Sequence, residues 1–169
     1  MSVKIENSDL TFESLKNKPY FPTVLKKEVS KANVLLVPLE NFRNGIDALF
    51  PENTDDFYQF LKCNESLDFI PNIVISDEQY KKIEMHCDWL FLGIVLVEYV
   101  ALPIFINILS NYLYDKIKNN KIKRDSIVEV EINVEETKTK KTKRIKYKGA
   151  ADDVKKSLGD ITVKIFKDE

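Results

Sequence analysis

Glycine, cysteine and histidine are scarce in this chain of 169 residues, and each scarcity excludes a class of functional site. The four glycines stand at positions 45, 93, 149 and 159, so neither a P-loop nor a dinucleotide-binding fingerprint can form. Two cysteines, Cys63 and Cys87, are too few for a disulfide scaffold, and we expect both to be reduced, as in a cytoplasmic protein. Because His86 is the only histidine, a zinc site would lack ligands. We expect no metal and no cofactor.

The sequence also lacks an arrangement of residues with catalytic chemistry. His86 and Cys87 are adjacent, and the side chains of helical neighbours diverge by about 100°, which disfavours a nucleophile pair. Paired acidic residues are better explained by predicted helix starts or a hairpin loop, and they stand at Asp55/Asp56, Asp77/Glu78, Glu135/Glu136 and Asp152/Asp153. We therefore predict that the protein is not an enzyme.

A long apolar run, from Trp89 to Leu113, stands in a sequence of which 31% is charged. Taken as one helix, the run exceeds the roughly 20 residues that span a bilayer. The basic residues that follow it would then hold the C-terminal part in the cytoplasm, as in an inner-membrane protein. That topology would carry 88 preceding residues across the membrane, although the N-terminus has no apolar h-region of a signal sequence. A membrane-anchored effector is therefore the first alternative.

The periodicity of the same run favours an interpretation in which it divides at Glu98–Pro103. Leu90–Val97 has the length and the β-branched content of a strand that is buried on both faces. From Leu102 onward, apolar residues recur at helical spacing and polar residues lie on the opposite side. We expect the end of the strand and this polar side to face a protein partner, through Glu98, Asn107, Asn111 and Asp115.

Local patterns ahead of the run predict short alternating elements. They are a helical region, a strand, a turn region, a helix and a second strand, at residues 8–31, 33–39, 41–51, 53–62 and 72–76. Ser76 and Gln79 have the spacing of a capping box, which predicts a further helix that runs toward Cys87.

The C-terminal third shows strand periodicity, because apolar and polar residues alternate over 128–134 and again over 144–148. An antiparallel register that pairs the apolar positions also pairs opposite charges. The predicted pairs are Val130–Tyr147, Ile132–Ile145, Glu131–Lys146 and Glu129–Lys148. A short helix, Ala150–Leu158, is expected to end at Gly159, and a last strand to follow over 161–165.

Together these patterns predict an α+β fold. Its expected parts are a mixed or antiparallel sheet with a central buried strand, packed helices, and a C-terminal unit of β-hairpin, helix and strand. An N-terminal α/β part, residues 1–88, and the part formed by residues 89–169 are expected to make one compact unit.

Charge is segregated along the chain, although the formal net charge is −1. Residues 115–148 carry 12 basic and 6 acidic side chains, whereas residues 1–114 carry 10 and 16. Basic residues concentrate near the second predicted strand and are candidates for contact with nucleic acid or another anion, at Lys138, Lys140, Lys141, Lys143, Arg144, Lys146 and Lys148. Because the predicted strand pairing already places carboxylates opposite two of them, nucleic-acid binding is the second alternative.

The pattern from residue 89 to residue 160 resembles the C-terminal part of the effector-associated constant components, small accessory domains of bacterial conflict and defence systems. The resemblance rests on LFLGIVLVEYVALPIFINILSNYLYDKIK, followed by the hairpin segments VEVEINV and IKYKG and by AADDVKKSLGDI. This chain departs from the family by having YVALP where the family is glycine-rich, and its first 80 residues carry no part of the resemblance. The resemblance implies a non-catalytic adaptor that couples a sensor to an effector, and it assigns no binding residue.

We therefore expect a cytoplasmic accessory subunit that acts by protein–protein association, in a bacterial antiviral defence system if the resemblance holds. The expected partner is a larger protein or another copy of the chain. Nucleic acid and a membrane are the less favoured partners.

Overall fold

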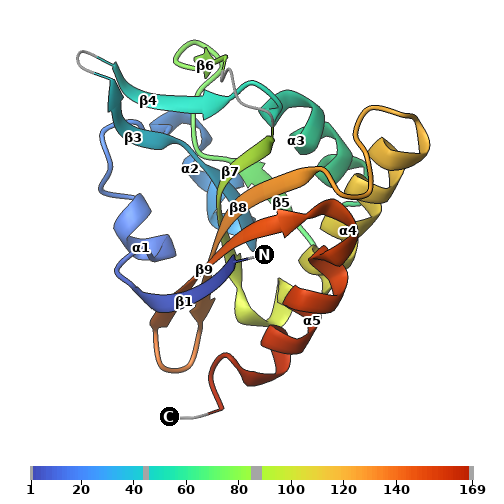
Figure 1. Cartoon of the computed structure of the whole chain (residues 1–169). Helices are drawn as coiled ribbons and strands as arrows, with labels where there is room; N and C mark the ends of the chain where they lie inside the picture. Colours follow the sequence, from blue (N-terminus) through green and yellow to red (C-terminus); the bar gives the residue numbers. More distant parts are fainter. Residues whose placement is uncertain (1, 44–45, 85–88, 168–169) are drawn as a thin grey trace.

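The computed structural model describes residues 2–43, 46–84 and 89–167, and its centre is a mixed β-sheet (Figure 1). Among the described residues, six strands form this sheet. In spatial order they are β1 (Ser2–Ser8), β9 (Lys141–Ala150), β8 (Ile127–Glu136), β7 (Leu90–Glu98), β2 (Val34–Val37) and β5 (Pro71–Ile73). Helices pack against the sheet, so the predicted α+β fold with a mixed sheet is confirmed.

Strand β7 lies in the middle of the sheet, parallel to β8 and antiparallel to β2. Val95, Leu96 and Val97 are all 0% exposed, although successive side chains of a strand point to opposite faces. Burial on both faces requires a continuous apolar sequence, and the first half of the long apolar run supplies it. The predicted strand Leu90–Val97 is confirmed.

The second half of the run forms a helix. A 3₁₀ turn, η2 (Tyr99–Ala101), separates β7 from α4 (Leu102–Lys118). Pro103 lies in the first turn of α4, where a residue without an N–H breaks no helical hydrogen bond. The run is thus divided at the predicted place. In the described part of the chain, no helix is long and apolar enough to cross a membrane.

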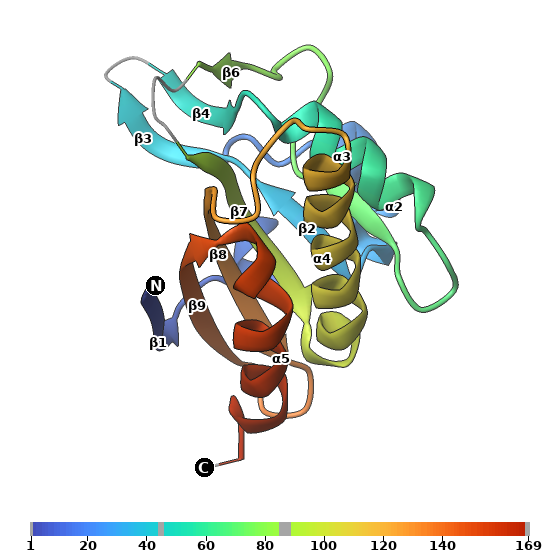
Figure 2. The same ribbon diagram turned by 45° about the vertical axis from the view of Figure 1, so that its right-hand side comes forward.

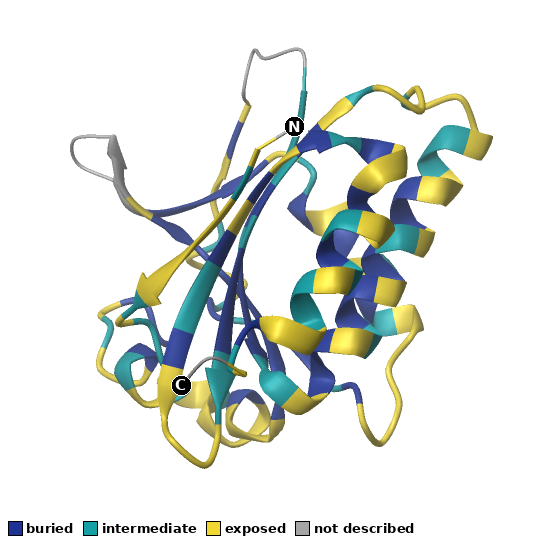
Figure 3. Ribbon diagram, turned by 60° about the horizontal axis from the view of Figure 1, so that its bottom comes forward, coloured by how far each residue is buried: buried dark blue, intermediate teal, exposed yellow. Residues whose placement is uncertain are grey.

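Helices α4 and α5 (Val154–Lys164) cover one face of the sheet, and α3 (Thr54–Cys63) adjoins α4 (Figure 2). The helix α3 begins with acidic residues in its first turn, as predicted. The ring of Phe57 in α3 lies 5.0 Å from the ring of Tyr112 and 6.4 Å from that of Phe105, both in α4. Figure 3 shows the buried sides of the helices turned toward the sheet and their exposed sides turned outward.

The hairpin of β8 and β9 has the register that the sequence predicts. All four predicted pairs are present, and opposite charges therefore face each other across the two strands. The apolar residues of β8, such as Val130 and Ile132, are buried in the core with the helices. The charged residues that alternate with them project from the opposite face of the sheet.

Two predictions in the N-terminal half are wrong. The predicted turn region 41–51 is strand where it is described, because β3 (Leu39–Arg43) and β4 (Ile46–Pro51) form an antiparallel pair beside the main sheet. Asn44 and Gly45, on which the turn prediction rested, lie outside the described residues. The predicted helix from Ser76 is absent from the described residues, where β6 (Lys82–Ile83) pairs with β4. A distant contact opposes the helix here, because Tyr80 stacks on Phe50 with ring centroids 5.3 Å apart. His86 and Cys87 lie outside the described residues.

The two ends of the chain also differ from expectation. Residues 2–8 form β1, which the sequence interpretation missed, and the predicted helical region 8–31 contains α1 (Phe12–Leu15), a 3₁₀ turn η1 (Thr23–Leu25) and α2 (Lys26–Lys31). The predicted last strand 161–165 is wrong, since α5 continues through Gly159 to Lys164. Val154 and Leu158, four residues apart, are both fully buried, and this helical spacing extends to the half-buried Ile161.

Gly93 provides a test of this architecture. It lies at an irregularity in the pairing of β7 with β8, its φ is +83°, and an added Cβ would stand 3.2 Å from the side chain of Pro51. We expect Gly93→Ala to lower the free energy of unfolding by about 1–3 kcal/mol, since both strain and crowding oppose it. Gly159→Ala is the matched control, because its Cβ would meet no atom within 4 Å and alanine favours a helix by about 0.5–1 kcal/mol. Denaturant unfolding measures both changes. Equal effects of the two substitutions would contradict the positive φ of Gly93 and its close contact with Pro51.

Candidate functional site: a groove between α4 and α5

Helices α4 and α5 each bury one side in the core, through residues such as Leu109 and Leu158, which are both 0% exposed. Two surface hollows run between the helices, and we name them together the α4–α5 groove. The first, of about 490 Å³, is lined by residues that include Ile104, Ile106, Asn107, Lys155 and Gly159. The second, of about 270 Å³, is lined by residues that include Asn111, Tyr114, Ile117, Asp152 and Lys155. Lys155 lines both hollows and joins them into one surface.

Gly159 of α5 lines the first hollow and places no side chain in it. Apart from its chain neighbours and the backbone of α5, no atom lies within 4 Å of the place where a Cβ of Gly159 would stand. The hydroxyl groups near this groove are engaged within their own helices, because Ser110 donates to the carbonyl of Ile106 at 2.8 Å and Thr162 to that of Gly159 at 2.7 Å. The groove therefore presents an apolar floor with few free hydroxyl groups.

The amide and ammonium groups at the groove are free in the part of the chain that the structure describes. Asn107, Asn111 and Lys155 make no side-chain hydrogen bond or ion pair there, and all three are exposed. Asparagine carries both donors and an acceptor, whereas lysine carries donors and a positive charge. The groove can therefore accept an apolar group in its floor and hydrogen-bond polar groups at its rim.

Exposed apolar side chains also occur on segments that line or adjoin the two hollows. Tyr114, which lines the second hollow, is 58% exposed. Val100 in η2 and Val163 in α5 are 73% and 53% exposed. The two segments lie together, because the hydroxyl of Tyr99 donates to the carbonyl of Thr162 at 3.1 Å. Apolar surface that gathers in this way marks interaction sites more often than isolated exposed residues do.

The predicted partner-facing residues are partly brought together. Asn107 and Asn111 line the groove, and Asp115 is exposed one turn further along α4. Glu98 lies apart from the residues that line either hollow. It ends β7 beside Glu135 of β8, where burial raises the pKa of Glu98 and the neighbouring Glu135 carboxylate raises it further.

The predicted basic cluster is not one patch. Lys138 and Lys140 are exposed in the turn between β8 and β9, and Lys141 opens β9. Lys143 lies over the ring of Phe166, 5.6 Å from its centre. The other three members alternate along the opposite face of β9, at Arg144, Lys146 and Lys148.

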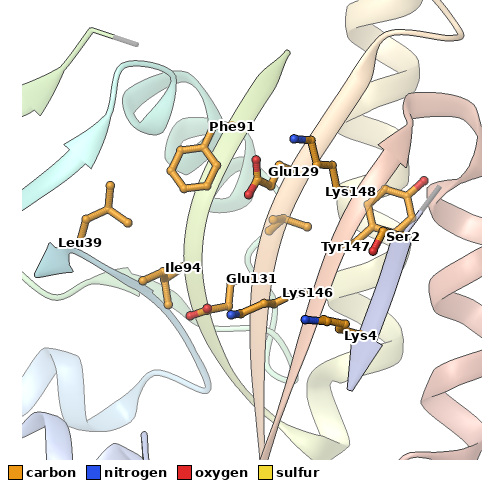
Figure 4. A pocket seen from close by; sticks show the side chains of 11 residues that line it. Ser2, Lys4, Leu39, Phe91, Ile94, Glu129, Glu131, Lys146, Tyr147 and Lys148 are labelled. Atoms are coloured by element: carbon orange, nitrogen blue, oxygen red, sulfur yellow. The ribbon is translucent and has the colours of Figure 1, made fainter. Parts of the chain in front are cut away.

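All three residues lie beside carboxylates of neighbouring strands, and Figure 4 shows Lys146 beside Glu131 and Lys148 beside Glu129. Lys146 lies 3.2 Å from Glu6 of β1, and Arg144 lies 3.5 Å from Glu131 of β8. The pKa of Glu6 is lowered by its hydrogen bond to Lys146. Opposite charges thus face each other across β8 and β9, as the predicted strand register requires.

A shallow hollow of about 370 Å³ lies on the same face, between β1 and β7. At one end Lys148 stands over the ring of Trp89, 4.1 Å from its centre, and the indole N–H of Trp89 donates to Glu129 at 2.9 Å. No group of acidic, histidine or cysteine side chains in the described residues is arranged to hold a metal ion.

The sequence interpretation missed the α5 half of the groove. It ended the helix at Gly159, so Gly159 and Thr162 were not expected to share a surface with α4. A usable signal was the helical spacing of Val154, Leu158 and Ile161 across the glycine. Comparison of the chain with protein-family models, with curated proteins and with solved structures finds no match.

Glu98→Gln should stabilise the protein at pH 7 and have no effect below about pH 4. Because the folded pKa of Glu98 is raised, the native state binds more protons than the unfolded state between the two pKa values, and stability falls as the pH rises through that interval. Because glutamine does not ionise, the variant keeps this stability. The difference in the free energy of unfolding amounts to less than about 1 kcal/mol for a partly solvated pair. Thermal unfolding at both pH values measures the effect, with exposed Glu78→Gln as the control. A stabilisation that does not change with pH would contradict the raised pKa of Glu98.

Proposed function

We propose that the protein is a cytoplasmic, non-catalytic accessory subunit that binds a larger protein through the α4–α5 groove. The observation that carries this proposal is the joining of an apolar floor, free amide groups and exposed apolar neighbours on one surface. Protein interfaces combine an apolar centre with a polar rim in the same way. The resemblance to the effector-associated constant components supports an adaptor role, because that family is non-catalytic.

The groove also indicates the chemistry of the partner segment. An apolar side chain of the partner fits the space above Gly159, between Ile104 and Thr162. A carboxylate of the partner beside it would meet Lys155, which is exposed and lines both hollows. Asn107 and Asn111 would bond to backbone or amide groups of the same segment. The expected ligand is therefore an apolar segment with an acidic residue.

Gly159→Trp tests the groove by filling its centre. We expect this variant to bind the partner at least about tenfold more weakly than the wild type, since the loss of a central anchor costs about 2 kcal/mol or more. The measurement is quantitative capture of a stoichiometric partner from the source cells by the full chain, followed by titration with the purified partner.

Leu67→Trp is the matched control, because Leu67 is 96% exposed and does not line the groove. The control should bind as the wild type does, and both variants should melt cooperatively. Equal binding by Gly159→Trp, or a wild-type chain that captures no stoichiometric protein, would overturn the proposal.

A further inference from the structure

The main sheet has one long unprotected edge, at β1. This strand pairs with β9 on one side, and no described strand lies on its other side, as Figure 2 shows at the margin of the molecule. The opposite edge of the sheet is short, because β5 has three residues and begins with Pro71, which has no N–H to donate. By contrast β1 has seven residues and no proline. Its outer backbone groups are therefore available to another strand.

The side chains of β1 are arranged in a way that suits one kind of partner. Lys4 and Glu6 alternate with Ile5, which is 50% exposed. On β9 the register neighbour of Lys4 is Lys146, so two positive charges lie side by side at this edge. A strand that placed a carboxylate on the outer side of Lys4 would offset this repulsion.

A second copy of β1 supplies that carboxylate. If two β1 strands pair in antiparallel orientation about Ile5, Lys4 of each copy stands opposite Glu6 of the other, and Ile5 stands opposite Ile5. A shift of the register by two residues in either direction places Lys4 opposite Lys4 or Glu6 opposite Glu6. Parallel pairing in register also opposes like charges. The sequence of β1 is therefore complementary to itself in a single antiparallel register.

We propose that β1 forms an antiparallel pair with β1 of a second copy of this chain, related by a two-fold axis at Ile5. The two six-stranded sheets then become one continuous sheet. Glu6 of the partner subunit then stands on the outer side of Lys4, and Lys4 of the partner subunit stands on the outer side of Glu6. This proposal is independent of the α4–α5 groove, which lies on other elements.

Charge reversal tests the pairing and its register together. We expect the wild type to have twice the monomer mass of 19.7 kDa in sedimentation and light-scattering measurements. Lys4→Glu and Glu6→Lys should each weaken the dimer about tenfold or more, because each change turns two attractive pairs into repulsive ones. The double variant K4E/E6K should restore the dimer, and an equimolar mixture of the two single variants should form a heterodimer.

Lys156→Glu, on the exposed side of α5, is the control for a change in net charge and should remain a dimer. Circular dichroism and melting curves show whether each variant keeps its fold. A monomeric wild type, or single charge variants that dimerise as the wild type does, would overturn the proposal.

A disulfide test reports the register without changing a charge. Residues opposite themselves at the two-fold axis have Cα atoms about 4.5–5.5 Å apart, within the range of a disulfide. Ile5→Cys should therefore give a covalent dimer under mild oxidation. Val3→Cys should not, since Val3 and its copy would be about 14 Å apart. The native cysteines are the same in both variants. Equal cross-linking of the two would overturn the proposed register even if the protein is dimeric.

Discussion

The fold depends on the burial of β7 on both faces. Val95 and Val97 point to one side of the sheet and Leu96 to the other, and all are removed from water. One side is covered by the helix that follows β7 in the chain, together with α5. On the other side the segment around α1 lies against β7 and β8, where the backbone N–H of Phe12 donates to Glu135 at 3.1 Å. A central strand without polar positions therefore requires two covering layers, and the chain supplies one from each end.

The same constraint explains why the long apolar run changes structure where it does. Glu98 is the first charged residue after the buried strand, and it stands where β7 leaves the sheet. A half-buried carboxylate beside Glu135 is tolerable there because that end of the strand still reaches solvent. The chain then turns through η2 and returns as α4, whose apolar side closes over the strand that precedes it. The run thus forms the core with a strand in its first half and a helix in its second half.

Local periodicity was sufficient to predict β7, α4 and the β8–β9 hairpin. The β8–β9 register followed from its apolar and charged alternation, because both patterns select the same pairing. The predictions failed in two places, once because two local patterns compete and once because distant contacts decide. Ile161, Val163 and Ile165 alternate as a strand does, but the buried Val154 and Leu158 continue into them at helical spacing. The Ser76–Gln79 spacing suits a helix start, but Tyr80 stacks on Phe50, and Lys82 binds Asp55 at 2.8 Å.

The residues of the candidate surfaces also fall into those that local sequence predicts and those that only the fold brings together. Asn107 and Asn111 were predictable because they lie on the polar side of a single helix. The Gly159 hollow was not, since it exists only when α5 lies beside α4. Strand β1 was not predicted because an edge strand with few apolar residues has no clear apolar pattern. Its stability comes from pairing with β9.

The two proposed surfaces are geometrically compatible. In the antiparallel pairing of β1, Lys4 and Glu6 of the two copies project from the same face of the joined sheet, so the two-fold axis is perpendicular to that sheet. Such an axis keeps each layer on its own side, and both α4–α5 grooves then open on the same side of the dimer. Two equivalent grooves on one side can engage two sites of one assembly at once, which raises the effective affinity beyond that of either groove. A weak individual contact at a shallow apolar groove would then be enough for an accessory subunit.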